Sequence, residues 1–179
     1  MKLLICSDVH GSSYYMEKVI SAFNEKKCDK IVILGDLLYH GPRNDLPHGH
    51  HPKGVIKLVN EYKEKIIMVK GNCEAEVDQM VLEFPINELV YMNVCDRDCY
   101  FTHGHKYGPS NPLPACKGSL VFYGHTHVTK HEDIDGVSYI NPGSTSLPKQ
   151  NTKNGFIVFD GQNIEFYDIE MELIDKIIL

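Results

Sequence analysis

The sequence has no excess of basic residues. Its 179 residues include 18 Lys and Arg against 24 Asp and Glu, which gives a formal net charge of −6. A protein that binds long nucleic acids needs a basic face, and a binder of single strands adds aromatic side chains along it. The charge therefore disfavours a nuclease and any long nucleic-acid partner. A short anionic ligand that is neutralised by metal ions remains compatible.

The sequence also lacks a long apolar run. The apolar segment at residues 2–6 is too short for the core of a signal peptide, and the charged Asp8 follows it closely. No later stretch approaches the roughly 20 apolar residues that cross a membrane as a helix. We therefore expect a soluble cytoplasmic protein with no membrane partner.

No C-x-x-C pair occurs among the six cysteines, so a zinc knuckle is not indicated. Without a signal peptide, the cysteines are expected to be reduced thiols rather than a disulfide framework. Five of them are interpreted as small core or surface residues. Cys73 is treated separately because it lies inside a polar motif.

The first half of the chain alternates short apolar runs with helical periodicity. Apolar runs at residues 2–6, 31–34 and 66–69 predict buried strands. Between them, apolar residues recur at helical spacing in two segments: Met16, Val19, Ile20, Phe23 and Val55, Leu58, Val59, Tyr62. Pro52 suits the first turn of the second helix. This β-α-β-α-β order predicts a parallel sheet.

The second half is predicted to be rich in strands. A short helix is expected at Val77, Met80, Val81 and Phe84, and strands are expected at residues 90–94, 99–102, 120–123, 137–140, 156–159 and 164–167. The pairs Asp135-Gly136 and Asp160-Gly161 indicate hairpin turns. Residues 171–179 fit either a strand or a helix. With no repeat or linker, residues 1–179 are expected to form one domain.

Five polar segments stand between or after these elements. They are Asp8-Val9-His10, Gly35-Asp36, Gly71-Asn72-Cys73-Glu74, His103-Gly104-His105 and Gly124-His125-Thr126-His127. Carboxylate, amide and imidazole groups hold divalent cations, although any one segment alone would be an ordinary polar site. The carboxyl ends of strands meet at one edge of an open sheet. Together, the segments predict a two-metal site.

The order of these segments resembles the calcineurin-like metallophosphoesterases, whose motifs are D-x-H, GD, GN-x-[DE], HGH and GH-x-H. Residues 40–44 and 76–80 add a finer resemblance to the small bacterial YfcE-type phosphodiesterases. The resemblance implies an α/β fold, a four-layer α/β/β/α sandwich of two mixed sheets flanked by helices. It also implies a dinuclear metal-dependent phosphoric ester hydrolase.

The resemblance further implies which residues hold the metals. It assigns Asp8, His10 and His127 to one ion, Asn72, His103 and His125 to a second, and Asp36 to both. A carboxylate can give one oxygen to each of two cations and offset their repulsion. Such ions polarise phosphoryl oxygens and make hydroxide available for attack on phosphorus. The ligand chemistry favours Mn²⁺, with Zn²⁺, Fe²⁺, Ni²⁺ and Mg²⁺ left open.

The catalytic candidates are Asn72, Cys73, His103 and Arg43. Many relatives carry histidine where this chain has Cys73, and a thiol is a weaker hydrogen-bond donor than imidazolium. Cys73 therefore either protonates an activated leaving group or merely fills space. Arg43 can contact two phosphoryl oxygens, or it is simply solvated.

Several other polar residues near these motifs match no ligand position. We interpret His48, His50 and His51 as part of a solvated loop and His131 as a surface residue. His40 and His105 are candidates for orienting the ligands. Residues 141–144 resemble the loop that lies beneath the site in the family, or they form a plain turn.

The predicted function is hydrolysis of a small organic phosphodiester. The alternatives are a phosphomonoesterase or nucleotide phosphohydrolase of the same fold, and a non-catalytic scaffold like the retromer subunit of this superfamily. Loss of ligands would favour the scaffold, but all seven ligand positions are occupied. The sequence leaves open whether the chain forms a homo-oligomer.

Overall fold

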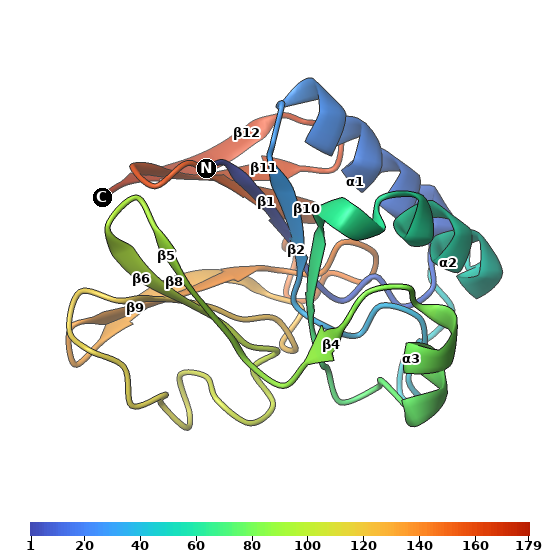
Figure 1. Ribbon diagram of the computed structural model, residues 1–179, viewed down its shortest axis with the longest axis horizontal. Helices are drawn as coiled ribbons and strands as arrows, with labels where there is room; N and C mark the ends of the chain where they lie inside the picture. The colour runs from blue at the N-terminus through green and yellow to red at the C-terminus, as the bar shows by residue number, and fades with distance from the viewer.

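The computed structural model describes residues 1–179 and consists of two facing β-sheets with helices on one side (Figure 1). The helices are α1 (Ser13–Glu25), α2 (Pro52–Glu61), the 3₁₀ turn η1 (Lys63–Lys65) and α3 (Glu76–Val81). Ser12 caps α1 by accepting a hydrogen bond from the Tyr15 backbone N–H at 3.2 Å, and Pro52 lies at the start of α2, as predicted.

The larger sheet has seven strands in the order β12-β11-β10-β1-β2-β3-β4. Their bounds are β1 (Leu3–Cys6), β2 (Lys30–Ile33), β3 (Ile66–Val69), β4 (Ile86–Asn87), β10 (Gly155–Phe159), β11 (Asn163–Asp168) and β12 (Leu173–Ile178). Strands β1 to β4 pair in parallel, as the β-α-β-α-β pattern predicts, and β10 to β12 add antiparallel pairs. The undecided C-terminal segment is therefore a strand.

The smaller sheet has five strands in the order β5-β6-β7-β9-β8. Their bounds are β5 (Val90–Val94), β6 (Arg97–Phe101), β7 (Leu120–Phe122), β8 (Thr129–Ile134) and β9 (Val137–Pro142). Strands β6, β7 and β9 are parallel, while β5 and β8 are antiparallel to their neighbours. Both sheets are thus mixed.

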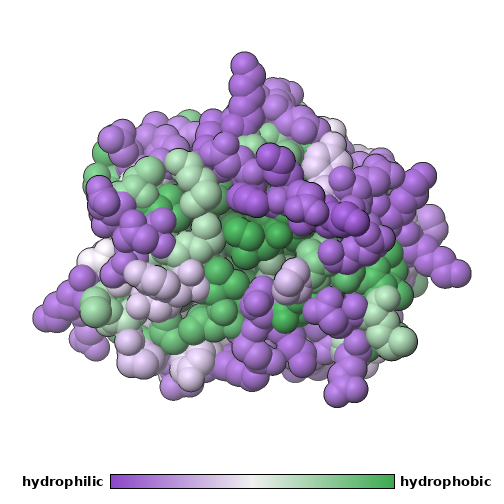
Figure 2. Space-filling model, in the orientation of Figure 1, coloured by the Kyte–Doolittle hydropathy of each residue, from purple (hydrophilic) through white to green (hydrophobic).

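Three apolar layers hold these elements together. One lies between α1, α2 and the larger sheet, and a second, formed by residues such as Ile5, Val32 and Phe122, lies between the sheets. Apolar side chains of this kind are visible in a band across the middle of the molecule (Figure 2). The third layer covers the outer face of the smaller sheet, where Leu113 packs on Tyr139.

The predicted sandwich of two mixed sheets is confirmed. Its two outer layers differ: α1 and α2 cover the larger sheet, whereas the segment at 102–119, which contains no helix, covers the smaller one. A hydrogen bond of 2.9 Å from the Leu113 backbone N–H to the Tyr139 hydroxyl fixes this segment on the sheet.

Three details differ from the sequence expectation. Strand β8 was not predicted, because its residues are mostly polar and it pairs on one side only, at a sheet edge. The two-residue strand β4 is too short to leave a pattern. Helix α3 ends at Val81, before Phe84, and its apolar residues Val77 and Met80 are 57% and 83% exposed.

Close backbone packing brings the ends of β2 and β3 together. A Cβ atom at Gly71 would lie 2.6 Å from the Asp36 backbone nitrogen and 2.7 Å from Glu74 Oε2. Only glycine fits this position, because atoms do not approach so closely without displacement. The spacing between the Asp36 and Asn72 segments therefore depends on Gly71.

We expect Gly71→Ala to lower the free energy of unfolding by about 3 kcal/mol, since the new methyl group must displace a backbone atom. Gly118→Ala is the matched control, because a Cβ there meets nothing within 4 Å and only the positive φ of 87° opposes it. That variant should lose about 1 kcal/mol. Chemical denaturation of both variants measures the difference, and an equal loss would contradict the steric argument.

Candidate metal centre

The seven predicted ligand residues come together at one edge of the two sheets. Each follows a strand, namely β1 for Asp8 and His10, β2 for Asp36, β3 for Asn72, β6 for His103, and β7 for His125 and His127. Short distances between side chains link them into one cluster. It runs from His127, Asp8 and His10 through Asp36 to His103, Asn72 and His125. Residues separated by more than 100 positions in the sequence are thus neighbours.

Five of these seven residues have left-handed backbone conformations. Their φ angles are 55° at Asp8, 49° at His10, 54° at Asp36, 66° at His125 and 61° at His127. Non-glycine residues seldom adopt positive φ, and such strain concentrates at functional sites. Hydrogen bonds between neighbouring turns hold two of these positions, from Asp8 N–H to Gly35 O at 3.1 Å and from His10 N–H to Asp36 O at 2.9 Å.

Three histidines are oriented by backbone carbonyl groups. The Nδ1 atoms of His10, His103 and His127 each lie 2.7 Å from the carbonyl oxygen of Tyr39, Leu34 and Leu147, respectively. A carbonyl oxygen can only accept, so each Nδ1 carries the hydrogen. In the neutral ring the lone pair is then on Nε2, the atom that faces the centre of the cluster.

Acceptor atoms of different residues face one another at the centre. The Nε2 atoms of His10 and His127 lie 3.1 Å apart, and His103 Nε2 lies 3.1 Å from Asn72 Oδ1. Asp8 Oδ1 is fully buried and has no hydrogen-bond partner. Facing lone pairs repel one another, and a buried acceptor without a partner is costly. These residues therefore fit divalent metal ions, which accept lone pairs from all of them.

The carboxyl groups of Asp8 and Asp36 remain ionised. Burial alone would raise the pKa of Asp8, but the adjacent His127 ring, whose Nε2 lies 3.2 Å from Asp8 Oδ1, and the positive charge of His103 outweigh burial and lower it. The pKa of Asp36 is likewise lowered against its own burial, chiefly by the hydrogen bond and charge of His103. Two buried carboxylates thus give the centre a negative charge that cations can neutralise.

The imidazole groups divide into neutral and protonated ones. Burial lowers the pKa of His10, and burial together with the charge of His103 lowers the pKa of His125. Burial would also lower the pKa of His103, but the hydrogen bond with Asp36 and the charges of Asp8 and Asp36 raise it to about 9. Without metal, protonated His103 therefore places one N–H donor among the acceptor atoms of the cluster.

Glu74 is a functional residue to which the sequence reasoning assigned no role. Its Oε2 accepts hydrogen bonds from the backbone N–H groups of Asp36 at 2.9 Å and Gly71 at 2.5 Å, and its Oε1 accepts one from Leu37 at 2.7 Å. Burial, followed by the charge of Asp36, raises the pKa of Glu74 to about 7. Glu74 joins the turns after β2 and β3, so it positions Asp36. In the sequence, the acidic position of the GN-x-[DE] motif is the feature that could have identified Glu74 as a functional residue.

The segment at 141–144 lies beneath the cluster and is more than a plain turn. Ser144 Oγ donates to the Asp8 carbonyl at 2.7 Å, and Asn141 Nδ2 donates to the Gly124 carbonyl at 2.8 Å. Asp8 Oδ2 also accepts hydrogen bonds from Ser7 Oγ at 2.6 Å and from the His125 backbone N–H at 2.9 Å. This network fixes Asp8. The resemblance of residues 141–144 to the family's loop pointed to Ser144, whereas Ser7 carried no sequence signal.

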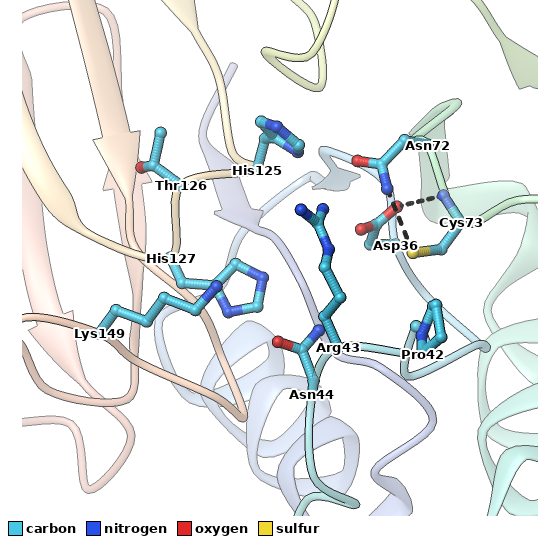
Figure 3. Close-up of a pocket in the computed structure, with 11 residues that line it drawn as sticks. Asp36, Pro42, Arg43, Asn44, Asn72, Cys73, His125, Thr126, His127 and Lys149 are labelled. Carbon is cyan, nitrogen blue, oxygen red and sulfur yellow. Dashed lines mark hydrogen bonds between the residues drawn. The ribbon is translucent and has the colours of Figure 1, made fainter.

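A cleft of about 430 Å³ opens over the cluster. The guanidinium group of Arg43 projects into it between His125 and Asn72, and Lys149 lies on the far side beside His127 (Figure 3). Neither cation forms an ion pair within the structure, so both are available to an anionic ligand. Lys149 was not identified from the sequence because it belongs to none of the five motifs.

Cys73 also lines the cleft. Its thiol is half-buried and lies 3.3 Å from Asn72 Nδ2, and its backbone N–H donates to Asp36 Oδ1 at 2.9 Å. Burial, followed by the negative charge of Asp36, raises the pKa of the Cys73 thiol to about 12. The thiol therefore keeps its proton at neutral pH. Its position suits both a proton donor and a space-filling residue.

The remaining histidines lie outside the cluster. His48 and His51 are exposed, whereas His50 is half-buried and its Nε2 has no partner. The ring of His40 lies 5.6 Å from that of His50. His105 is exposed, with its ring 5.3 Å from that of His103. The solvated-loop interpretation thus fits His48 and His51 better than His50.

Comparison with known proteins places the chain among phosphoesterases. The sequence model described as "Calcineurin-like phosphoesterase superfamily domain" matches residues 1–163. Phosphodiesterase YfcE of Escherichia coli is 43% identical over 162 residues, which cover 89% of this chain and 88% of that protein. Phosphodiesterase MJ0936 of Methanocaldococcus jannaschii is 28% identical over 187 residues, covering 96% of this chain and all of that one.

Solved structures agree with this placement. The structure of Yfce, a phosphoesterase from E. coli, superposes with a TM-score of 0.95 and 37% identity over 99% of both chains. Vps29 from Entamoeba histolytica has a TM-score of 0.63 at 16% identity, covering all of this chain and 99% of that one. The second likeness concerns the fold alone. No helix of the structure is long and apolar enough to cross a membrane.

Metal binding should displace the proton of His103, because a ligand nitrogen must be free of hydrogen. With the pKa of His103 at about 9, the apparent metal affinity should rise about tenfold per pH unit between pH 7 and 8.5 and level off above. Isothermal titration calorimetry in buffers of different ionisation enthalpy measures both the affinity and the protons released. His131→Gln is the matched control, and an affinity that does not change with pH would contradict the prediction.

Proposed function

Because this chain belongs to the calcineurin-like phosphoesterase superfamily, we propose that it is a metal-dependent phosphodiesterase that hydrolyses a small organic phosphodiester. The observation that carries the proposal is the cluster of acceptor atoms that face one another, including the unpartnered Asp8 Oδ1, which divalent cations would satisfy. Two similar proteins, from E. coli and M. jannaschii, are named phosphodiesterases. Residues 1–179 are proposed to act as one catalytic domain.

We further propose two metal ions per chain. Asp8, His10 and His127 would hold the first, Asn72, His103 and His125 the second, and Asp36 both. In support, Asp36 Oδ2 lies 3.8 Å from His10 Nε2 and 3.5 Å from His103 Nε2, between the two ligand groups. When bound, such ions polarise phosphoryl oxygens and lower the pKa of water. The mixed oxygen and nitrogen ligands favour Mn²⁺.

The protein's own groups would orient and neutralise the substrate. Arg43 offers a planar pair of N–H donors to the non-bridging oxygens, and Lys149 adds a second positive charge. Asn72 and His103 would fix the phosphoryl group against the metals. The Cys73 thiol would donate its proton from Sγ to the departing oxygen. In-line transfer at phosphorus depends mainly on such positioning and charge neutralisation.

The alternatives are weaker on specific grounds. A non-catalytic scaffold would not need seven ligand side chains in one acceptor-lined centre. The substrate of a phosphomonoesterase or nucleotide phosphohydrolase carries more negative charge than a phosphodiester. The cleft has only two cationic side chains, Arg43 and Lys149, to neutralise that charge. The cytoplasmic location, the absence of a long nucleic-acid partner and the possible homo-oligomer stay predictions.

The function is tested by comparing an aryl phosphodiester with the monoester of the same leaving group, with several added metals. We expect higher kcat/KM on the diester and complete loss of activity with a chelator. Asp36→Asn should lose at least one metal equivalent and reduce kcat by about 10² or more, because an amide cannot bridge two cations with charge. Asp45→Asn, an exposed carboxylate outside the cluster, is the control. Normal turnover by Asp36→Asn with two bound metal equivalents would contradict the assignment of Asp36 as the ligand shared by both ions.

Cys73 is tested by its response to leaving groups. If the thiol protonates the leaving oxygen, Cys73→His should raise the rate on poor leaving groups, where general acid catalysis supplies roughly 10² to 10⁴. Activated esters should respond little. Equal losses on all substrates in Cys73→His, together with an unaffected Cys73→Ala, would assign the residue to packing alone. Rates across a series of aryl and alkyl esters distinguish the two results.

A further inference from the structure

A second cavity adjoins the metal cleft. It has a volume of about 320 Å³ and shares His125 and Thr126 with the cleft as a common wall. In the cleft, Thr126 lies on the side opposite Asn72 and Cys73 (Figure 3). The far walls of the second cavity come from the polar edge strand β8, through Lys130 and Glu132, and from Ser110 in the segment at 102–119. A ligand held at the metals could therefore extend past Thr126 into this space.

The charges of the two spaces differ. In the second cavity Lys130 Nζ and a carboxylate oxygen of Glu132 form an ion pair at 2.8 Å, so the cation and anion offset each other. The cleft instead contains the unpaired cations Arg43 and Lys149. The cleft thus suits an anionic group, whereas the second cavity has no net charge with which to attract one.

The walls of the second cavity combine apolar and hydrogen-bonding surface, and the apolar surface is the larger share. The Tyr123 ring and Val128 provide apolar surface, but Glu132, Lys130 and Ser110 bring hydrogen-bonding groups. An acyl chain would desolvate these groups without replacing their hydrogen bonds, which is unfavourable. A ring that carries hydroxyl or amide functions would cover the apolar surface and also supply hydrogen bonds to these groups. The volume is near the lower end of the ~300–1,000 Å³ typical of ligand pockets, so it accommodates one or two rings.

We propose that the second cavity binds one of the two organic groups of the phosphodiester, and that this group is uncharged and polar, of the size of a hexose or a nucleoside. The inference rests on the proposed phosphodiesterase function. It adds the substrate class: a diester with an anionic phosphate over the metals and a hydroxylated or heterocyclic substituent beyond Thr126.

The test uses three diesters that share a 4-nitrophenyl leaving group and differ in the second substituent, which is methyl, hexyl or thymidin-5′-yl. In the wild type, kcat/KM should be roughly tenfold higher for the thymidinyl ester than for the methyl ester, about the effect of one net hydrogen bond. The hexyl ester should gain less. Ser110→Phe, which narrows the cavity, should bring the thymidinyl-to-methyl ratio close to one. The control is Ser21→Phe, on the exposed face of α1.

Each outcome has one interpretation. A wild-type ratio near one, a ratio that Ser110→Phe leaves unchanged, or a preference for the hexyl ester would overturn the inference while leaving the phosphodiesterase intact. If the wild type with added metal hydrolyses none of the three diesters, the proposed function itself fails. Measuring the methyl ester separately in each variant reports whether the variant is folded.

Discussion

The mutual repulsion of buried acceptor atoms is the constraint on which the rest of the structure depends. Oxygen atoms of two carboxylates, three imidazole Nε2 atoms and an amide oxygen face one another, and Asp8 Oδ1 among them has no hydrogen-bond partner. Such an arrangement is unfavourable unless cations occupy the centre. In the metal-free protein, the raised pKa of His103 supplies one proton as a partial substitute. Proton and metal therefore compete for the same lone pair.

The fold is built to resist that repulsion. Left-handed backbone conformations cost about 1–2 kcal/mol each, and five ligand residues adopt them. Since a whole domain is stable by only about 5–15 kcal/mol, the surrounding structure must hold these turns firmly. Glu74 and Gly71 do so between β2 and β3, and Ser144 does so beneath Asp8. The apolar layers on both faces of the larger sheet keep the strand ends from separating.

The sequence predicted those parts of the protein that leave a local pattern. Buried strands of wholly apolar residues and the five motifs were recognisable, and the strand ends converge as the parallel order requires. The parts that were missed depend on distant neighbours. Glu74 matters through backbone groups of another turn, Lys149 through its place on the cleft, and the polar strand β8 through an edge pairing. No local pattern could indicate the cavity between β8 and the segment at 102–119.

The distribution of charge explains how an acidic protein can accept an anionic substrate. The net charge of −6 repels anions at long range, but screening limits that effect to about 10 Å at moderate salt. Inside the cleft the local charges decide. There the two carboxylates would be neutralised by metal, while Arg43 and Lys149 remain unpaired. The same argument separates the two spaces beside Thr126: attraction for the phosphate is confined to the cleft, and the neutral ion pair of Lys130 and Glu132 leaves hydrogen bonding as the basis for selecting the organic group.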